Sequence, residues 1–144
     1  MRGIGVSPGI VFGKAFVYKK SEIIISDELI SKELVDDEIK KLNLVIENSK
    51  NQIYKLKDKT KAELGEEEAE IFQAHIMILE DEEYIYKIKN KIRKGLYNCE
   101  KAVKIVSDEY IKFFESIDDE YMRARADDVK DISDRIIKNI LGVI

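Results

Sequence analysis

Residues 35–57 read VDDEIKKLNLVIENSKNQIYKLK, and the apolar side chains in this stretch recur in steps of four and three residues. Side chains at this spacing share one face of an α-helix, because the helix turns once every 3.6 residues. The stripe consists of Val35, Ile39, Leu42, Ile46, Ile53 and Leu56, around a polar interruption at Ser49. We therefore predict a long amphipathic helix that begins near Ser31 and ends at Gly65, with a seam like that of a coiled coil.

A second helix is expected after Gly65, since residues 66–68 are all glutamate and the first turn of a helix favours carboxylates. This helix carries two apolar stripes. They consist of Phe72, Ile76 and Leu79, and of Ile71, Ala74 and Ile78 beside His75. One stripe is enough for the core, so the second must face another part of the protein or a partner that binds reversibly.

Two further helices are expected downstream. The acidic residues 80–83 predict a kink or a restart in the second helix, with Asp81 as the N-cap of the continuation and Gly95 as its end. Asn98 is placed to cap a third helix, and Asp118 or Asp119 a fourth that ends at Gly142. The apolar stripes are Val103, Val106, Tyr110, Phe113 and Ile117, then Met122, Ala126, Val129, Ile136 and Ile140. Short links between long helices predict an antiparallel four-helix bundle, so the fold class is mainly α, with the second helix kinked.

The first 25 residues have a different pattern, in which glycines separate short runs of valine, isoleucine and phenylalanine. This pattern is typical of strands joined by tight turns, and Ser7-Pro8-Gly9 suits such a turn. A lone pair of strands is marginally stable in water, so these strands are expected to belong to a sheet whose other strands this sequence lacks. The predicted organisation is a β segment at residues 1–25 and a helical domain at residues 26–144.

Composition excludes several classes of protein. The 144 residues carry a formal net charge of −4, which does not favour binding to nucleic acid. No apolar run approaches the roughly 20 residues of a membrane span, and no signal peptide is recognisable, so a cytoplasmic protein is expected. The single cysteine, Cys99, lies on an apolar helix face and is expected to be an inert packing residue.

Residues for catalysis are scarce. His75 is the only histidine, so neither a catalytic triad nor a metal site of the helix-bundle type can be assembled around it. Gly13-Lys14 is followed by alanine and does not complete a phosphate-binding loop. We therefore expect no catalytic residue, metal ligand or cofactor in this chain, and we expect His75 to make contacts at or near the surface.

One further pattern lies on the fourth helix, where Tyr121, Arg125 and Asp128 share a face just after an acidic cap. Arginine and tyrosine are enriched in protein interfaces. The same spacing also fits an exposed face with a simple Arg–Asp pair. The residues alone therefore indicate a helical interaction module with a severed β segment.

Three segments, in this order and separation, resemble the start of the Enzyme I family, the phosphoenolpyruvate–protein phosphotransferases. They are GIGVSPGIVFGKAFV at residues 3–17, GEEEAEIFQAHIMILEDEE at residues 65–83 and DDEYMRARADDVKDISDRIIKNILG at residues 118–142. The resemblance implies an α/β phosphohistidine domain, a helical insert that binds the phosphocarrier protein HPr, and a C-terminal barrel. The barrel would bind phosphoenolpyruvate and Mg²⁺ and form a homodimer.

The same resemblance implies a division of labour between this chain and its parent. Phosphate would pass from phosphoenolpyruvate to a histidine in a motif beyond Ile144, and then to HPr during sugar uptake. The chain alone would be inactive, and residues 1–25 would complete the sheet of the phosphohistidine domain. The HPr-facing residues would be Glu66, Glu67, His75, Ile78, Asp81, Glu83, Phe114, Tyr121, Met122 and Arg125. Their acids would guide a partner that is basic around its active histidine.

Two alternatives remain open at this point. The first is a paralogous Enzyme I, either nitrogen-related or fused to other domains; Met1 directly before the glycine-rich start favours the sugar-transport form instead. The second is a stand-alone helical adaptor with no role in phosphotransfer.

Overall fold

The computed structural model describes residues 24–143, and within this range the chain is helical, without a strand. The elements are a 3₁₀ turn, η2 (Lys32–Leu34), and five helices: α1 (Val35–Leu64), α2 (Glu66–Leu79), α3 (Glu82–Gly95), α4 (Cys99–Glu115) and α5 (Glu120–Leu141). The prediction of a mainly α fold is confirmed. The predicted β segment falls almost wholly outside the described residues. None of the described helices is long and apolar enough to cross a membrane.

Side-chain caps begin three of the helices as predicted. The Asp81 carboxylate accepts hydrogen bonds from the amides of Glu83 and Tyr84 and so starts α3. Asn98 caps α4, and Asp119 caps α5. Because these short side chains satisfy amides that have no partner inside the helix, they fix where each helix starts. The expected restart at residues 80–83 therefore separates α2 from α3.

Two glycines at helix ends have different physical roles. Gly65 lies between α1 and α2 with a φ of +103°, a conformation that side chains with a Cβ rarely adopt. Gly95 closes α3 for another reason, since a Cβ there would lie 2.7 Å from the ring of Tyr97. The left-handed residue after α3 is Leu96, at φ 57°, and not the glycine. Gly95 thus permits a close contact with an aromatic ring.

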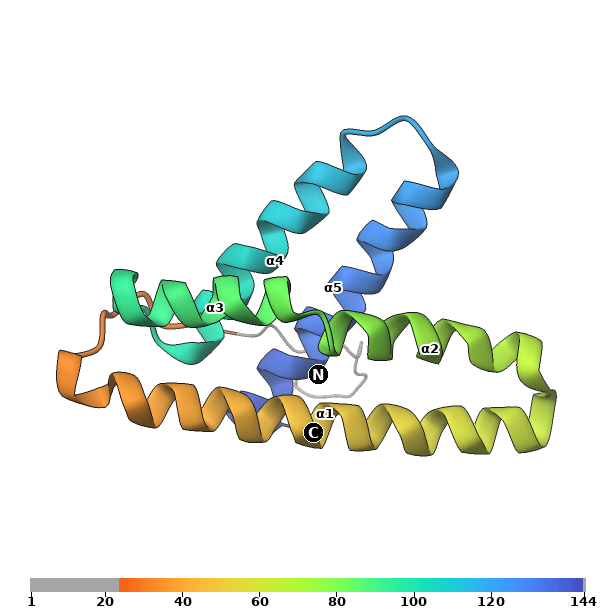
Figure 1. Cartoon of the computed structure of the whole chain (residues 1–144), viewed down its shortest axis with the longest axis horizontal. Coiled ribbons are helices and arrows are strands. Elements are labelled where there is room, and N and C mark those ends of the chain that lie inside the picture. Colours follow the sequence, from red (N-terminus) through yellow and green to blue (C-terminus); the bar gives the residue numbers. More distant parts are fainter. Residues whose placement is uncertain (1–23, 144) are drawn as a thin grey trace, which may run out of the picture.

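The helices form two groups (Figure 1). The long helix α1 runs antiparallel beside α2, and α3 continues from α2 along the same side. The second group is the hairpin of α4 and α5, which crosses the first obliquely and projects beyond it. The hairpin packs through α5 against α1 and α2, and through α4 against α3. The helices therefore do not form the antiparallel four-helix bundle that the short links predicted. The α4–α5 hairpin crosses the first group obliquely, and only its base is packed.

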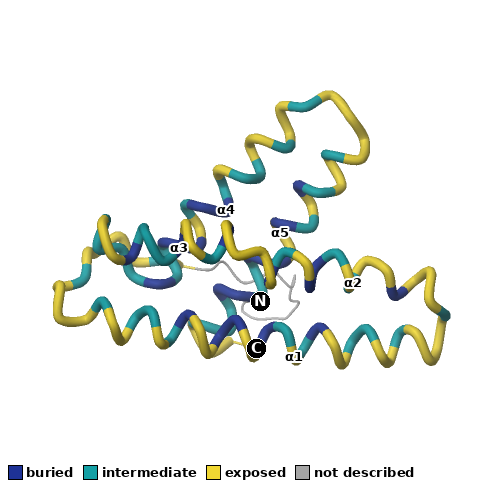
Figure 2. Tube along the Cα trace, viewed as in Figure 1, coloured by how far each residue is buried: buried dark blue, intermediate teal, exposed yellow. Residues whose placement is uncertain are grey.

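The core lies where the two groups cross (Figure 2). Buried side chains from all five helices meet there, including Leu42, Ile76, Ile88, Val103 and Ile136. The tube becomes exposed toward the end of the hairpin, residues 113–121, which we call the hairpin tip. Burial of apolar surface stabilises the crossing at about 25 cal/mol per Å², and little of it acts on the tip.

A polar network also joins α1 to α5 inside the crossing. The Asn139 side chain donates to Ser49 Oγ and to Gln52 Oε1, and its own carbonyl accepts from Gln52 Nε2, at 2.9–3.0 Å. Arg135 Nη1 also donates to Gln52 Oε1. Ser49 is fully buried, so its hydroxyl needs such a partner. The polar interruption in the stripe of the first helix is thus a cross-helix contact.

Candidate protein-docking surface

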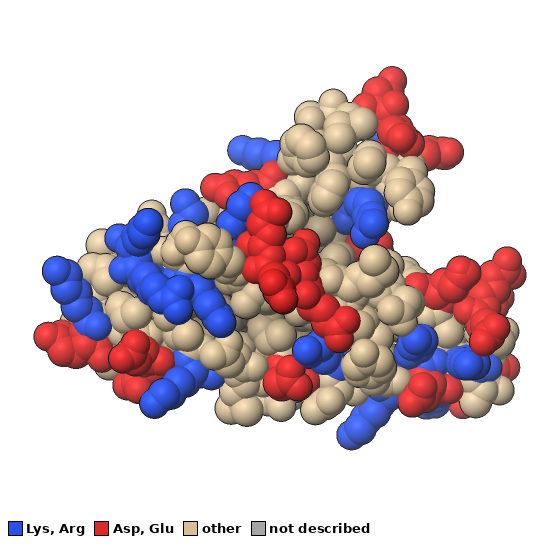
Figure 3. All heavy atoms as spheres, in the orientation of Figure 1, with Lys and Arg blue, Asp and Glu red and all other residues tan. Residues whose placement is uncertain are grey.

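The second apolar stripe of α2 is only partly used by the fold. Ile78 packs against the core, and Ala74 is half-buried. Ile71 is 49% exposed, and the neighbouring Met77 is 53% exposed. Apolar side chains of α2 therefore remain uncovered. Figure 3 shows that the molecule is hollowed between the α4–α5 hairpin and α2.

A cavity of about 390 Å³ with aromatic side chains in its wall lies at the junction of α3 and α4. We call it the aromatic pocket; it is lined by Asp81, Glu83, Lys87, Glu109, Tyr110, Phe113 and Phe114. The rings of Tyr84, Tyr110, Phe114 and Phe113 follow one another edge to face, with centroids 5.4–6.3 Å apart. Edge-to-face contacts of this kind hold aromatic rings in fixed orientations.

The charges around the aromatic pocket are mainly negative. Three carboxylates line it, and its one cation, Lys87, pairs with Glu83 at 3.2 Å and lies over the ring of Tyr110. The hydrogen bond to Glu83 raises the pKa of Lys87, so this amine stays charged. Burial raises the pKa of the Tyr110 phenol, which stays neutral. The pocket therefore offers aromatic surface within a mostly acidic border.

The predicted residues of α5 lie in its first two turns, next to the hairpin tip. Tyr121 is 66% exposed, and the Arg125 guanidinium lies over its ring at 5.9 Å. Met122 is half-buried. A cation held over an aromatic ring keeps its hydrogen-bond donors available to an anionic group of a partner.

His75 differs from its prediction, because it is buried, with 6% of its surface exposed. Its Nε2 lies 3.4 Å from Asp128 Oδ1, which joins α2 to α5. The two atoms are within ion-pair distance but are not aligned for a hydrogen bond. Burial raises the pKa of Asp128, and the nearby His75 and Arg125 oppose this effect in part. His75 thus lies largely beneath the surface.

The other predicted residues fall into two groups. Asp81, Glu83 and Phe114 share the aromatic pocket. Glu66 and Glu67 are exposed at the distant start of α2, where Glu66 pairs with Lys61 of α1 at 3.2 Å. The described contacts do not bring these two glutamates to the aromatic pocket.

Phe113 is a second residue whose predicted place differs from the structure. It was expected in the core stripe of the third helix, yet it is 61% exposed and lines the aromatic pocket. Neighbouring residues on a helix point about 100° apart, so Phe113 and Phe114 cannot both face the core. The adjacent pair of phenylalanines was the available signal.

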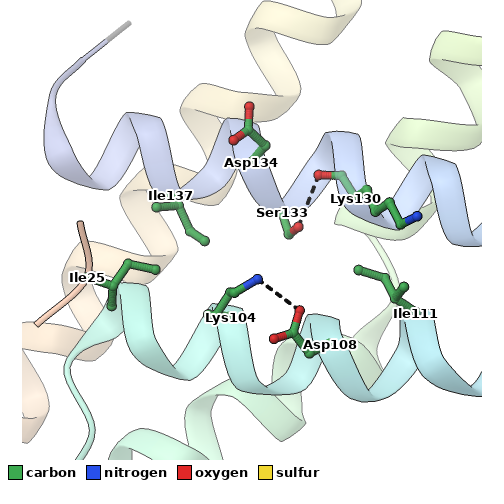
Figure 4. A pocket seen from close by; sticks show the side chains of 8 residues that line it. All are labelled: Ile25, Lys104, Asp108, Ile111, Lys130, Ser133, Asp134 and Ile137. Atoms are coloured by element: carbon green, nitrogen blue, oxygen red, sulfur yellow. Dashed lines mark hydrogen bonds and ion pairs between the residues drawn. The ribbon is translucent and has the colours of Figure 1, made fainter. Parts of the chain in front are cut away.

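A second cavity, of about 220 Å³, lies between α4 and α5 (Figure 4). It is lined by Ile25, Lys104, Asp108, Ile111, Lys130, Ser133, Asp134 and Ile137. The Lys104 amine pairs with Asp108 at 3.1 Å, and the Ser133 hydroxyl donates to the Lys130 carbonyl. None of the predicted partner-binding residues lines this cavity. In residues 24–143, no group of three or more His, Cys, Asp or Glu side chains could hold a metal ion.

Comparison with known proteins relates this chain to one family. The family described as "PEP-utilising enzyme, N-terminal" matches residues 2–125. The chain is 36% identical over 143 residues to a phosphoenolpyruvate-protein phosphotransferase of Priestia megaterium, covering 99% of this chain and 25% of that protein. It is 38% identical over 141 residues to the protein of the same name from Haemophilus influenzae, covering 98% and 24%. The chain thus spans about a quarter of the length of these curated relatives.

A solved structure is similar over the same region. The chain resembles the NMR solution structure of Enzyme I (nEIt) with a TM-score of 0.81 and 40% sequence identity. The similarity covers 90% of this chain and 52% of that one.

Proposed function

Since this chain belongs to the family of PEP-utilising enzymes and matches their N-terminal region, we propose that its function is to dock a phosphocarrier protein of the HPr type. The parent protein would be a phosphoenolpyruvate–protein phosphotransferase. It would take phosphate from phosphoenolpyruvate onto a histidine outside this chain and pass it to HPr. The chain would supply the docking surface and no catalytic group.

The observation that carries this proposal is the set of exposed apolar side chains on α2 and on the α4–α5 hairpin. Ile71, Met77, Phe113 and Tyr121 are each about half exposed or more. An interface needs a central apolar area that can be desolvated, with polar groups at its rim. These side chains provide such an area.

The charges around this area favour a basic partner. Asp81, Glu83 and Glu109 border the aromatic pocket, and residues 66–68 are acidic at the far end of α2. Complementary charge raises the rate of encounter more than the final affinity. Arg125 is then available for an anionic group of the partner, beside the acidic rim.

We expect HPr to shift the amide resonances of α2, of the aromatic pocket and of the start of α5 when it is added to the chain. The variant Arg125→Glu combined with Glu67→Lys should slow association by about tenfold. Its unfolding free energy should stay within about 1 kcal/mol of the parent chain, as is usual for surface changes.

A charge-matched control tests whether the location of the charges matters. Lys40→Glu combined with Glu33→Lys makes the same exchange near the start of α1, where both residues are exposed. This control should bind HPr as the parent chain does. An unchanged spectrum at high HPr concentration would refute the docking function, and equal slowing by both variants would refute the proposed surface.

A further inference from the structure

Two side chains could compete for the Asp128 carboxylate. His75 approaches the carboxylate from α2, with Nε2 at 3.4 Å from Oδ1. Arg125 lies one turn before Asp128 on α5, at a spacing that commonly forms ion pairs. Yet the Arg125 guanidinium lies over the Tyr121 ring, and between residues 24 and 143 it joins no ion pair of 4.0 Å or less.

Burial makes the pairing of Asp128 matter. The Asp128 side chain is 15% exposed, and that of His75 is 8% exposed. A carboxylate in such a place loses part of its hydration, so it needs a donor or a cation from the protein. The His75 imidazole comes within ion-pair distance of this carboxylate from α2, without an aligned hydrogen bond.

We propose that His75 is a positioning residue for docking: it occupies the Asp128 carboxylate from across the α2–α5 contact and so leaves Arg125 free to bind the partner. This inference rests on the proposed docking function and adds a role for a residue that does not touch the partner. If His75 is removed, Arg125 turns back toward Asp128 and is lost from the docking surface.

The competition predicts that a second substitution rescues the first. His75→Phe keeps the bulk of the ring beside Phe72, whose ring meets that of His75 edge to face at 6.2 Å, but it offers no donor. We expect it to weaken HPr binding by about fivefold or more. Adding Asp128→Asn removes the competing charge and should restore most of the affinity.

A purely structural role predicts the opposite outcome. If the pair acted only by holding α2 against α5, Asp128→Asn would leave the loss caused by His75→Phe unchanged or increase it, and this result would overturn the proposal. His75→Gln keeps an N–H donor, and we expect it to bind HPr within about twofold of the parent chain. If His75→Phe fails to fold, His75→Gln becomes the test variant. In that case, an HPr affinity as low as that of Arg125→Gln would overturn the proposal.

The Arg125 side chain gives a readout that does not depend on HPr. Its Nε–H resonance in the 144-residue chain should shift in His75→Phe and return in the double variant. If the parent chain fails to bind HPr, the proposed function fails, while this resonance still reports the competition. If HPr binds and the Arg125 resonance is the same in all variants, the present inference alone is overturned.

Discussion

Cys99 shows how an interior position controls the chemistry of one side chain. It begins α4, is fully buried, and its amide donates to Glu38 Oε1 of α1 at 2.7 Å. Burial raises the pKa of the thiol to about 12, and the nearby Glu38 acts in the same direction. Since the thiolate is the reactive form, the folded chain keeps this cysteine inert.

We expect stability to fall at high pH because the unfolded chain releases the Cys99 proton first. Its folded-state pKa is above the unfolded value of 9.0, so this contribution is complete below pH 9 and is lost as pH rises toward 12. The unfolding free energy should fall by roughly 1 kcal/mol per pH unit in this range. Chemical denaturation at pH 8, 9 and 10 measures this slope.

A Cys99→Ala variant provides the control for the alkaline slope. It should be less stable at every pH, yet its stability should change less between pH 9 and 10 than that of the parent chain. Buried Tyr84 contributes only above its ordinary pKa of 10, which its burial raises further. An identical slope in the variant would show that other groups cause the alkaline loss.

Single residues also mark where sequence reasoning failed. The inert role of Cys99 was predictable, because its position on an apolar face is a local property. The burial of His75 was not, since it depends on Asp128, which lies 53 positions away in the sequence on another helix. The prediction for Phe113 was wrong for a related reason. Because the α4–α5 hairpin projects obliquely beyond the other helices, it exposes a position that helical spacing assigns to the core.

At the level of elements, the junction of α2 and α3 combines two tasks. Asp81 starts α3 through its hydrogen bonds to two amides, and the same carboxylate lines the aromatic pocket. Tyr84, in the first turn of α3, reaches Ser107 of α4 with a hydroxyl–hydroxyl distance of 2.7 Å. The helix start and the pocket wall are therefore set by one short segment.

Substitutions at Asp81 should separate capping from charge. Asp81→Ala removes the acceptor and should lower the unfolding free energy by about 1 kcal/mol. Asp81→Asn keeps a side-chain oxygen and should lower it by only a few tenths of a kcal/mol, while it should slow HPr association as far as Asp81→Ala does. Denaturant unfolding and stopped-flow binding measure the two effects. Equal stability losses in both variants would mean that the charge, and not the cap, stabilises α3.

Helix starts were predictable because each depends on a few adjacent residues. Asp81 and Asn98 were identified as caps from their type and their place before an apolar run, and the cap of α5 was narrowed to Asp118 or Asp119, of which the structure uses Asp119. The end of α3 at Gly95 was also predicted, but its physical reason was not. There Gly95 relieves a clash with Tyr97, a contact that no turn rule describes.

At the scale of the whole molecule, stability is unevenly distributed along the α4–α5 hairpin. Its base contributes Val103, Val106, Ile132 and Ile136 to the core, and the polar network of Ser49, Gln52, Arg135 and Asn139 ties α5 to α1. The hairpin tip has few buried side chains. The length and spacing of the helices followed from the sequence, but the crossing of the two groups follows from such long-range contacts and was not predicted.

We expect hydrogen exchange to reveal this gradient. Amides in the second half of α4 and the first turns of α5 should exchange at least about tenfold faster than amides near Val103 and Ile136, because the tip can open without breaking the core. Bound HPr should slow exchange at the tip and leave the base unchanged. Uniform exchange rates along both helices would contradict this description.

The segment before α1 is attached to the link between α3 and α4 and to the start of α4. Ile30 donates its amide to the Leu96 carbonyl at 2.8 Å, Asn98 donates to the Ser26 carbonyl, and Asp27 pairs with Lys101 at 2.7 Å. All three contacts join residues 26–30 to the link between α3 and α4 or to the start of α4, on the far side of the core from the hairpin tip. A mechanical load on the chain at residue 24 would therefore be borne first by these three contacts, before it could reach the hairpin tip.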